Sequence, residues 1–275
     1  MVNKLMGSLF AVILCAGSAA AADFSGADQI WVTRQGSVEN TQKARAAYQA
    51  MIDSGELKGS DLVYAVTQLG RTYFYEGEVL NTKEGEGEKR RRELFSECWK
   101  DKMELISPKA LGYETEQYWY WRAACIGLYS EVSGTVENLR NVVLVREAFS
   151  KGGRLNMSYE GGGLLRSEAG IISNPKAKPI PGLYNPQKAL ELIDKALAQP
   201  AFPGSNNTGA DFCENYRRKA MILKELGRID ESKEFTAKSL ADFKELEANG
   251  MLPEGLGPET IHCMNLLEQF QTSFK

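Results

Sequence analysis

The stretch YEGGGLLR, residues 159–166, has the residue types of an anion-binding turn. Glycines ahead of a helix allow close backbone approach and leave N–H groups free at the positive end of the helix. An anion could bind there, near Tyr159, Gly162 and Gly163, with Arg166 as a second donor. Alternatively, the glycines permit a tight crossing of two helices, while Arg166 pairs with a carboxylate or a helix C-terminus. We favour this structural interpretation, because one isolated Gly-rich turn is a weak signal.

A second candidate site lies in the aromatic stretch EQYWYWRAACIGLYSE, residues 116–131. On a helix, Tyr118, Trp121 and Arg122 fall on one side, and further rings point in other directions. So many large rings cannot all face one core seam, which predicts that some line a groove, a pore or a partner surface. Trp121 and Arg122 are the stronger candidates for a ligand wall, and a plain core role is the alternative for each ring.

Recognisable catalytic chemistry is missing from the sequence. The single histidine, His262, has no second ligand at metal-binding spacing and no paired nucleophile. The chain contains no H-E-x-x-H, G-x-S-x-G or P-loop motif. We therefore expect a protein that is not an enzyme and uses no metal or cofactor, while a hidden pair of catalytic carboxylates keeps a cell-wall-acting enzyme as the least favoured hypothesis.

The first 22 residues have the pattern of a cleaved signal peptide. They combine one early lysine, Lys4, with an apolar run from Leu9 to Cys15 and a series of small residues that ends at Ala22. Because Cys15 follows three bulky residues rather than small ones, soluble export is expected rather than lipid anchoring. The sequence thus predicts a signal peptide at 1–22, one helical-repeat domain at 23–275, and a periplasmic or secreted location.

The remaining composition is that of an ordinary globular domain. The formal net charge of −3 offers no general attraction for nucleic acid, and no later run is long and apolar enough to cross a bilayer. The dense basic run Lys89–Arg92 follows several glutamates and is interpreted as a solvated helix start.

Apolar residues recur at steps of three and four almost everywhere, and no segment alternates as a half-buried strand does. The predicted fold class is all-α, built of stacked antiparallel helical hairpins with about ten helices. The expected helices are Val38–Ser54, Ser60–Glu78, Glu88–Ile106, Glu114–Val132, Val136–Ser150, Leu164–Ile172, Pro186–Gln199, Ala210–Leu226, Asp230–Asn249 and Pro258–Phe274.

The segment KELGRIDESKEFTAKSL, residues 224–240, resembles the turn and second helix of a tetratricopeptide repeat. Small residues at Ser232 and Ser239 would let paired helices approach closely. Ala189 and Ala196 take the same positions in NPQKALELIDKALAQP. The repeats are therefore degenerate and tetratricopeptide-like.

The order of these elements is similar to that of the helical T-component proteins associated with tripartite ATP-independent periplasmic (TRAP) transporters. The matching elements are an exported start, a Tyr-Trp pair at 118–119 or 120–121, Gly162-Gly163 with Arg166, and a connector with prolines at 175, 179 and 181. The resemblance implies a bundle of helical hairpins around a pore or cleft. It also implies a protein partner, such as the solute-binding protein of a transporter, or a small ligand.

Four cysteines remain after the signal peptide, and export favours two disulfides between them. Cys98 would lie on the second helix of one hairpin and Cys125 on the first helix of the next. Cys213 begins the next-to-last hairpin, and Cys263 lies on a terminal helix that should pack back against it. This register predicts Cys98–Cys125 and Cys213–Cys263, with four buried free thiols as the alternative.

The leading functional hypothesis is an exported, non-enzymatic helical-repeat protein that binds a partner protein or a small ligand and assists a periplasmic solute transporter. The alternative is a periplasmic assembly scaffold that has no ligand of its own.

Overall fold

A computed structural model describes residues 21–80 and 86–274 of the chain. These residues form helices and no strand, which confirms the predicted all-α class. Residues 1–20, which make up most of the predicted signal peptide, lie outside the described residues. The α-helices are α1 (Ser25–Val32), α2 (Val38–Asp53), α3 (Gly59–Tyr75), α4 (Glu86–Glu97), α5 (Pro108–Leu111), α6 (Glu116–Glu131), α7 (Thr135–Leu155), α8 (Tyr159–Ser173), α9 (Pro186–Leu197), α10 (Cys213–Glu225), α11 (Ile229–Ala248) and α12 (Gly257–Thr272).

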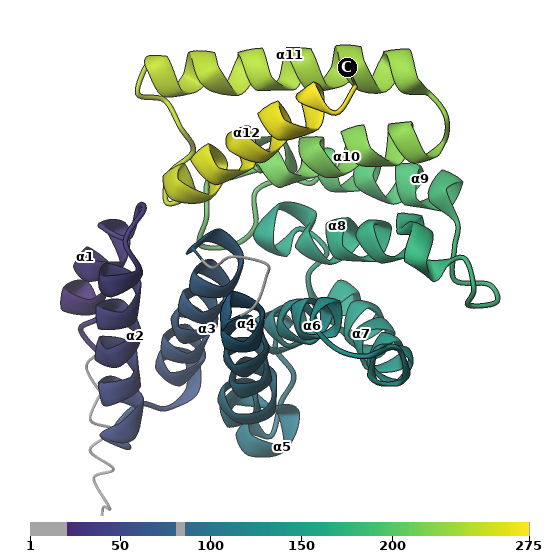
Figure 1. Ribbon diagram of the computed structural model, residues 1–275. Coiled ribbons are helices and arrows are strands. Elements are labelled where there is room, and N and C mark those ends of the chain that lie inside the picture. Colours follow the sequence, from purple (N-terminus) through teal and green to yellow (C-terminus); the bar gives the residue numbers. More distant parts are fainter. Residues whose placement is uncertain (1–20, 81–85, 275) are drawn as a thin grey trace, which may run out of the picture.

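Consecutive helices pack as hairpins, most extensively α2 with α3, α6 with α7, α8 with α9, and α10 with α11. Figure 1 shows two sets of hairpins with different directions: α2 to α4 stand upright, whereas α8 to α12 run across the upper side of the molecule. The largest hydrophobic core lies among α1 to α8, and two smaller cores fill α8 to α10 and α10 to α12. No described helix has both the length and the apolar character needed to cross a bilayer.

Small residues sit where the repeat pattern places them. Ser232, Ser239, Ala189 and Ala196 are all buried. The Ser232 hydroxyl donates a 2.7 Å hydrogen bond to the Ala220 carbonyl, so α11 packs directly on the backbone of α10. The small side chains thus allow the close crossing expected of a tetratricopeptide-like hairpin. The buried Ser232 hydroxyl has a hydrogen-bond partner, the Ala220 carbonyl.

Two local differences from the predicted helices have a tertiary cause. The short helix α1 was not predicted; it is held by burial of Ala27 and Trp31 and by Asp28, which accepts hydrogen bonds from two tyrosine hydroxyls on α2 and α3. The predicted helix Glu88–Ile106 instead changes from α4 to a π-helical turn, η2 (Cys98–Lys102), and then a 3₁₀ turn, η3 (Met103–Ile106). This change buries Cys98, Met103 and Ile106 together.

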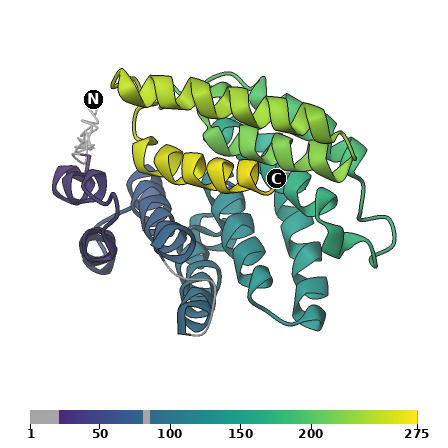
Figure 2. The same ribbon diagram turned by 45° about the horizontal axis from the view of Figure 1, so that its top comes forward.

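The beginning and end of the described fold are joined by Arg34, which follows α1. Its guanidinium donates to both carboxylate oxygens of Glu259 on α12, at 2.8 and 2.6 Å, and to the Gly255 carbonyl at 3.2 Å. Arg34 is almost fully buried and lies 3.9 Å from the centre of the Trp31 ring. A residue near the start of the described chain thus contacts the last helix. In the tilted view of Figure 2 the yellow helix α12 runs beside α11, and the end where it begins lies near the purple and dark-blue helices.

Both predicted disulfides are present. Cys98 of η2 is bonded to Cys125 of α6, and Cys213 of α10 to Cys263 of α12, with Cα–Cα distances of 6.0 and 6.1 Å. The first cross-link joins two neighbouring hairpins, and the second fixes the terminal helix on the hairpin before it. The hairpin register inferred from the sequence is therefore confirmed at both places.

Reduction of the Cys98–Cys125 bond should lower the free energy of unfolding. With a sequence separation of 27 residues, the chain-entropy relation gives a loss of about 3.5 kcal/mol, because the unfolded chain regains the freedom that the cross-link removed. Urea unfolding of the oxidised wild type and of an oxidised Cys98→Ser/Cys125→Ser variant, which keeps the Cys213–Cys263 bond, measures the loss after non-reducing peptide mapping has established the pairing. Four alkylatable thiols in freshly isolated protein, or a link between Cys98 and Cys213, would contradict the prediction.

Candidate functional site

The Gly-rich stretch that the sequence singled out forms a left-handed turn at the start of α8. Glu160, Gly161 and Gly162 have φ values of 52°, 59° and 75°, and right-handed helix follows them. Glu160 is the one non-glycine residue with positive φ in the described part of the chain. The left-handed conformation costs an L-residue about 1–2 kcal/mol, so Glu160 keeps it only because its surroundings fix the backbone.

The three glycines are required by close packing. A Cβ atom on Gly161 would lie 2.1 Å from a ring carbon of Phe212, one on Gly162 would lie 2.8 Å from the Cα of Ala196, and one on Gly163 would lie 2.3 Å from the Tyr120 ring. Three elements, α6, α9 and the residue before α10, therefore approach the same turn from different sides. We call residues 160–163 with these surroundings the joint, because the two sets of hairpins meet there.

Asn215 of α10 is a central polar contact of the joint. It is fully buried, and its amide nitrogen donates to the carbonyls of Gly161 and Gly209 at 3.0 and 2.7 Å. Its amide oxygen accepts a 2.9 Å hydrogen bond from Arg166. One side chain thus provides a partner for a carbonyl of the left-handed turn, for the Gly209 carbonyl and for the guanidinium of Arg166.

Arg166 lies inside the joint rather than at its surface. Besides Asn215, it donates to the Glu160 carbonyl and to the Tyr120 hydroxyl, each at 3.3 Å, and its guanidinium lies 5.4 Å from the centre of the Phe212 ring. These contacts agree with the structural interpretation of Arg166, although its partners are neutral oxygens and not the carboxylate or helix end that the sequence suggested. A ligand-binding role for Arg166, Gly162 and Gly163 stays a prediction.

The aromatic candidates surround the same joint. The Trp121 indole donates a 3.2 Å hydrogen bond to the Tyr159 hydroxyl, and the Tyr159 ring packs on those of Tyr120 and Phe202. Trp121 is only 4% exposed, and Tyr159 is also buried. Burial, with the negative charge of Glu160 next in importance, raises the pKa of the Tyr159 hydroxyl, which therefore stays neutral at physiological pH. The structure brings Trp121 and Tyr159 together but places them in the interior.

Tyr118 and Arg122 lie on another side of α6. Tyr118 is buried and donates a 3.3 Å hydrogen bond to Glu104, while the Nε of Arg122 lies 3.8 Å from the same carboxylate. The Arg122 side chain is 13% exposed, and its buried Nε and Nη1 have no hydrogen-bond acceptor. Among the predicted ligand residues, Arg122 is therefore the one with unused hydrogen-bonding capacity.

The charged side chains that border the joint were not predicted. Arg71 of α3 forms an ion pair with the buried carboxylate of Glu160, which raises the pKa of Arg71 even though burial opposes the charge. On α10, Arg217 and Arg218 both contact Glu214. Spacings of three and four residues in ENYRR suggest such pairs on a helix, but only the packing of α10 on α8 brings them beside Arg166.

Two shallow hollows on the described surface lie away from the joint. One lies beside Arg92 and Tyr129, and the other lies between α11 and α12 beside Lys233 and Phe274. The described residues also contain no cluster of histidine, cysteine or acidic side chains arranged to hold a metal ion.

The chain matches no protein-family model, and no curated protein is significantly similar to it.

Replacing Gly162 by alanine should destabilise the fold by more than about 3 kcal/mol, since a strained φ of 75° is combined with a Cβ 2.8 Å from backbone. Gly182→Ala is the matched control, because Gly182 has a φ of 72° but nothing within 4 Å of its Cβ position. It should cost about 1 kcal/mol. Urea unfolding of both variants measures the difference, and equal losses would show that close approach at Ala196 is not the constraint.

Glu214 should make stability sensitive to acid. Burial alone would raise the pKa of this carboxyl, but Arg217 and Arg218 lower it to about 2 from the ordinary value of 4.5. A pKa that is lower in the folded state adds stability above pH 4.5, and this stability is lost as the pH falls toward 2. The free energy of unfolding, measured with urea between pH 7 and about pH 2.5, should therefore fall more steeply for the wild type than for Glu214→Gln. Parallel profiles would contradict this assignment, because the two proteins share every other carboxylate.

Proposed function

We propose that this protein is an exported, non-enzymatic helical-repeat protein that binds a partner protein or a small ligand and assists a periplasmic solute transporter. The observation that carries the proposal is the meeting of charged side chains from separate hairpins around one joint. Arg71 comes from α3, Glu160 from α8 and Glu214 from α10, and the Arg71 and Glu214 side chains are 29% and 32% exposed. Charged groups gathered from distant hairpins and still reachable by solvent are what a binding site in a helical-repeat protein requires.

The relative positions of the motif residues also support the proposal. The two motifs that carry the resemblance to the TRAP-associated T-components are 41 residues or more apart in the sequence, yet they contact each other. Gly163 packs on the Tyr120 ring, and Arg166 donates to the Tyr120 hydroxyl. A shared order of motifs is more informative when the motif residues also form one cluster. The transporter role rests on this resemblance, and partner binding rests on the site.

Two disulfides are compatible with export, because such bonds persist mainly in oxidising compartments. The non-enzymatic part of the proposal rests on the lack of a recognisable nucleophile, base or metal motif in the sequence.

An assembly scaffold without a ligand is the second candidate. The burial of Trp121 and Tyr159 favours it, since rings that are already enclosed by the protein leave no open ligand wall in this conformation. The genes that adjoin this one separate the two candidates: transporter membrane subunits and a solute-binding protein favour the first, and their absence favours the scaffold.

If a neighbouring gene encodes a solute-binding protein, the purified pair should form a complex that depends on Arg122. Arg122→Gln should weaken that complex at least tenfold, because it removes the positive charge of a side chain that is 13% exposed, while helicity and melting temperature change little. Arg228→Gln is the control; this arginine lies at the turn between α10 and α11 and pairs only locally with Glu231. Isothermal titration calorimetry measures both affinities. Equal affinities for the two variants, or no complex with the wild type, would count against the proposal.

A further inference from the structure

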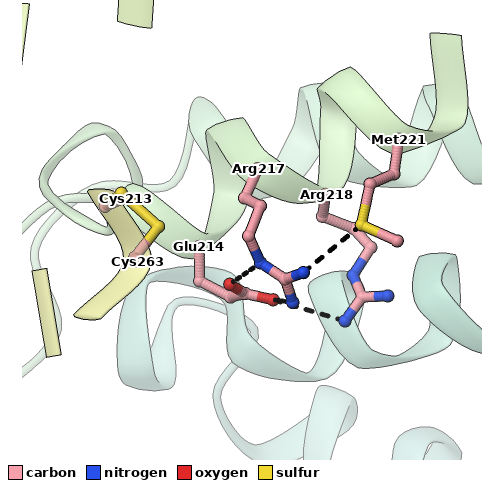
Figure 3. The surroundings of a disulfide bond; sticks show 6 residues. All are labelled: Cys213, Glu214, Arg217, Arg218, Met221 and Cys263. Atoms are coloured by element: carbon pink, nitrogen blue, oxygen red, sulfur yellow. Dashed lines mark hydrogen bonds and ion pairs between the residues drawn. A yellow bond between two sulfur atoms is a disulfide. The ribbon is translucent and has the colours of Figure 1, made fainter. Parts of the chain in front are cut away.

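The pair Arg217 and Arg218 on α10 shares a single carboxylate. The Nε and Nη2 of Arg217 donate to the two oxygens of Glu214, both at 2.6 Å, and the Nη2 of Arg218 donates to one of them at 3.3 Å. Figure 3 shows both guanidinium groups directed toward this carboxylate, one turn from the Cys213–Cys263 bond. Two positive side chains therefore converge on one negative side chain at a place that the disulfide holds fixed.

The two guanidinium groups have more donors than Glu214 can use. The Nη1 of Arg217 reaches only the Met221 sulfur, at 3.4 Å, which is a weak acceptor. The Nε of Arg218 is buried and has no hydrogen-bond acceptor. Buried donors are satisfied in most folded proteins, so an unpaired guanidinium donor indicates that an acceptor is expected there.

Positive charge also exceeds negative charge around Glu214. Arg166 interacts electrostatically with Glu214. Among the described residues it donates hydrogen bonds only to neutral oxygens, those of Asn215, Tyr120 and the Glu160 backbone, so no carboxylate hydrogen-bonded to it balances its charge. Burial, together with the like charges of Arg217 and Arg166, lowers the pKa of Arg218 in spite of the Glu214 carboxylate.

Two acidic residues outside α8 to α12 interact electrostatically with this group. Glu78 and Glu131 both interact with Arg217, and Glu131 also interacts with Arg218, but both carboxylates already form ion pairs with Arg91. They weaken the positive potential at Arg217 without providing the missing acceptor for Arg218.

Solvent reaches these side chains. The Arg217 and Arg218 side chains are 21% and 26% exposed. The Arg218 guanidinium also lies against α8 at Gly170, where a Cβ atom would be 3.0 Å from its Cζ. The absence of a side chain at Gly170 leaves room for the guanidinium.

We propose that Arg217 and Arg218 bind the carboxylate or phosphate group of a small anionic ligand. Guanidinium groups recognise both anions through paired N–H donors, and two guanidiniums on one helix turn present these donors side by side. Glu214 holds the arginines in place and competes with the ligand for them. The inference rests on the ligand-binding part of the proposed function and gives the chemical class of that ligand.

The test uses inorganic phosphate and succinate with the full mature chain at pH 7. Both anions should raise the melting temperature more than sodium chloride at equal ionic strength does. Isothermal titration calorimetry should then give at least a tenfold weaker affinity for Arg218→Gln. Lys219→Gln, which removes a neighbouring positive charge that is paired with Asp194 at 2.7 Å, should stay within about twofold of the wild type.

Glu214→Gln supplies the second, opposite measurement. Removal of the competing carboxylate should tighten anion binding several-fold, whereas a purely structural role of the arginines predicts no gain. A stabilisation equal to that by chloride, or the same affinity for wild type and Arg218→Gln, would overturn the proposal. If the anions fail to bind but the solute-binding protein does, the anion site is wrong and the partner-binding part of the proposed function stands. Anion binding without any partner complex supports the anion site and the ligand-binding part, and counts against the transporter partner alone.

Discussion

The left-handed turn at Glu160, Gly161 and Gly162 decides how the two sets of hairpins meet. Glu160, Gly161 and Gly162 are left-handed, and the right-handed part of α8 begins only after them. The turn exists because glycines remove the steric cost and because Asn215, 54 residues further along the chain, donates a hydrogen bond to the Gly161 carbonyl. The turn lies where α6, α9 and the residue before α10 approach one another.

Polar groups inside the joint must find their hydrogen-bond partners within the protein. The rings of Tyr120, Trp121 and Tyr159 exclude water from the joint, so each buried donor needs a partner inside the protein. Arg166 meets this need with neutral oxygens, and Arg71 meets it for the Glu160 carboxylate. These partners come from α3, α6, α8 and α10. The hydrogen bonds inside the joint can therefore form only when the hairpins have this relative placement.

Long-range links then hold the ends of the fold. Arg34 joins the segment after α1 to the first turn of α12, and Cys263, four residues beyond Glu259, ties the same helix to α10. Helix α12 is thus held both by the segment after α1 and by α10. The arginine pair proposed to bind an anion lies next to this disulfide, on a helix that can move little, which favours preorganised donors over flexible ones.

The sequence by itself determined the helix period, several ends of helices and the hairpin register. Asn185 caps α9 and Gly227 ends α10 with a φ of 75°, which are positions that asparagine and glycine favour, and the order of hairpins was enough to pair the cysteines. These features depend on neighbours within a few residues or on repeat stacking. Tertiary structure alone decided the short helix α1, the left-handed conformation of Glu160, and the inward direction of the aromatic candidates. It also decided that Asn215 and the arginines of α10 border the joint. The reason is physical: a helical pattern gives the angle at which a side chain leaves its helix, but which elements pack against that side chain depends on residues tens of positions away.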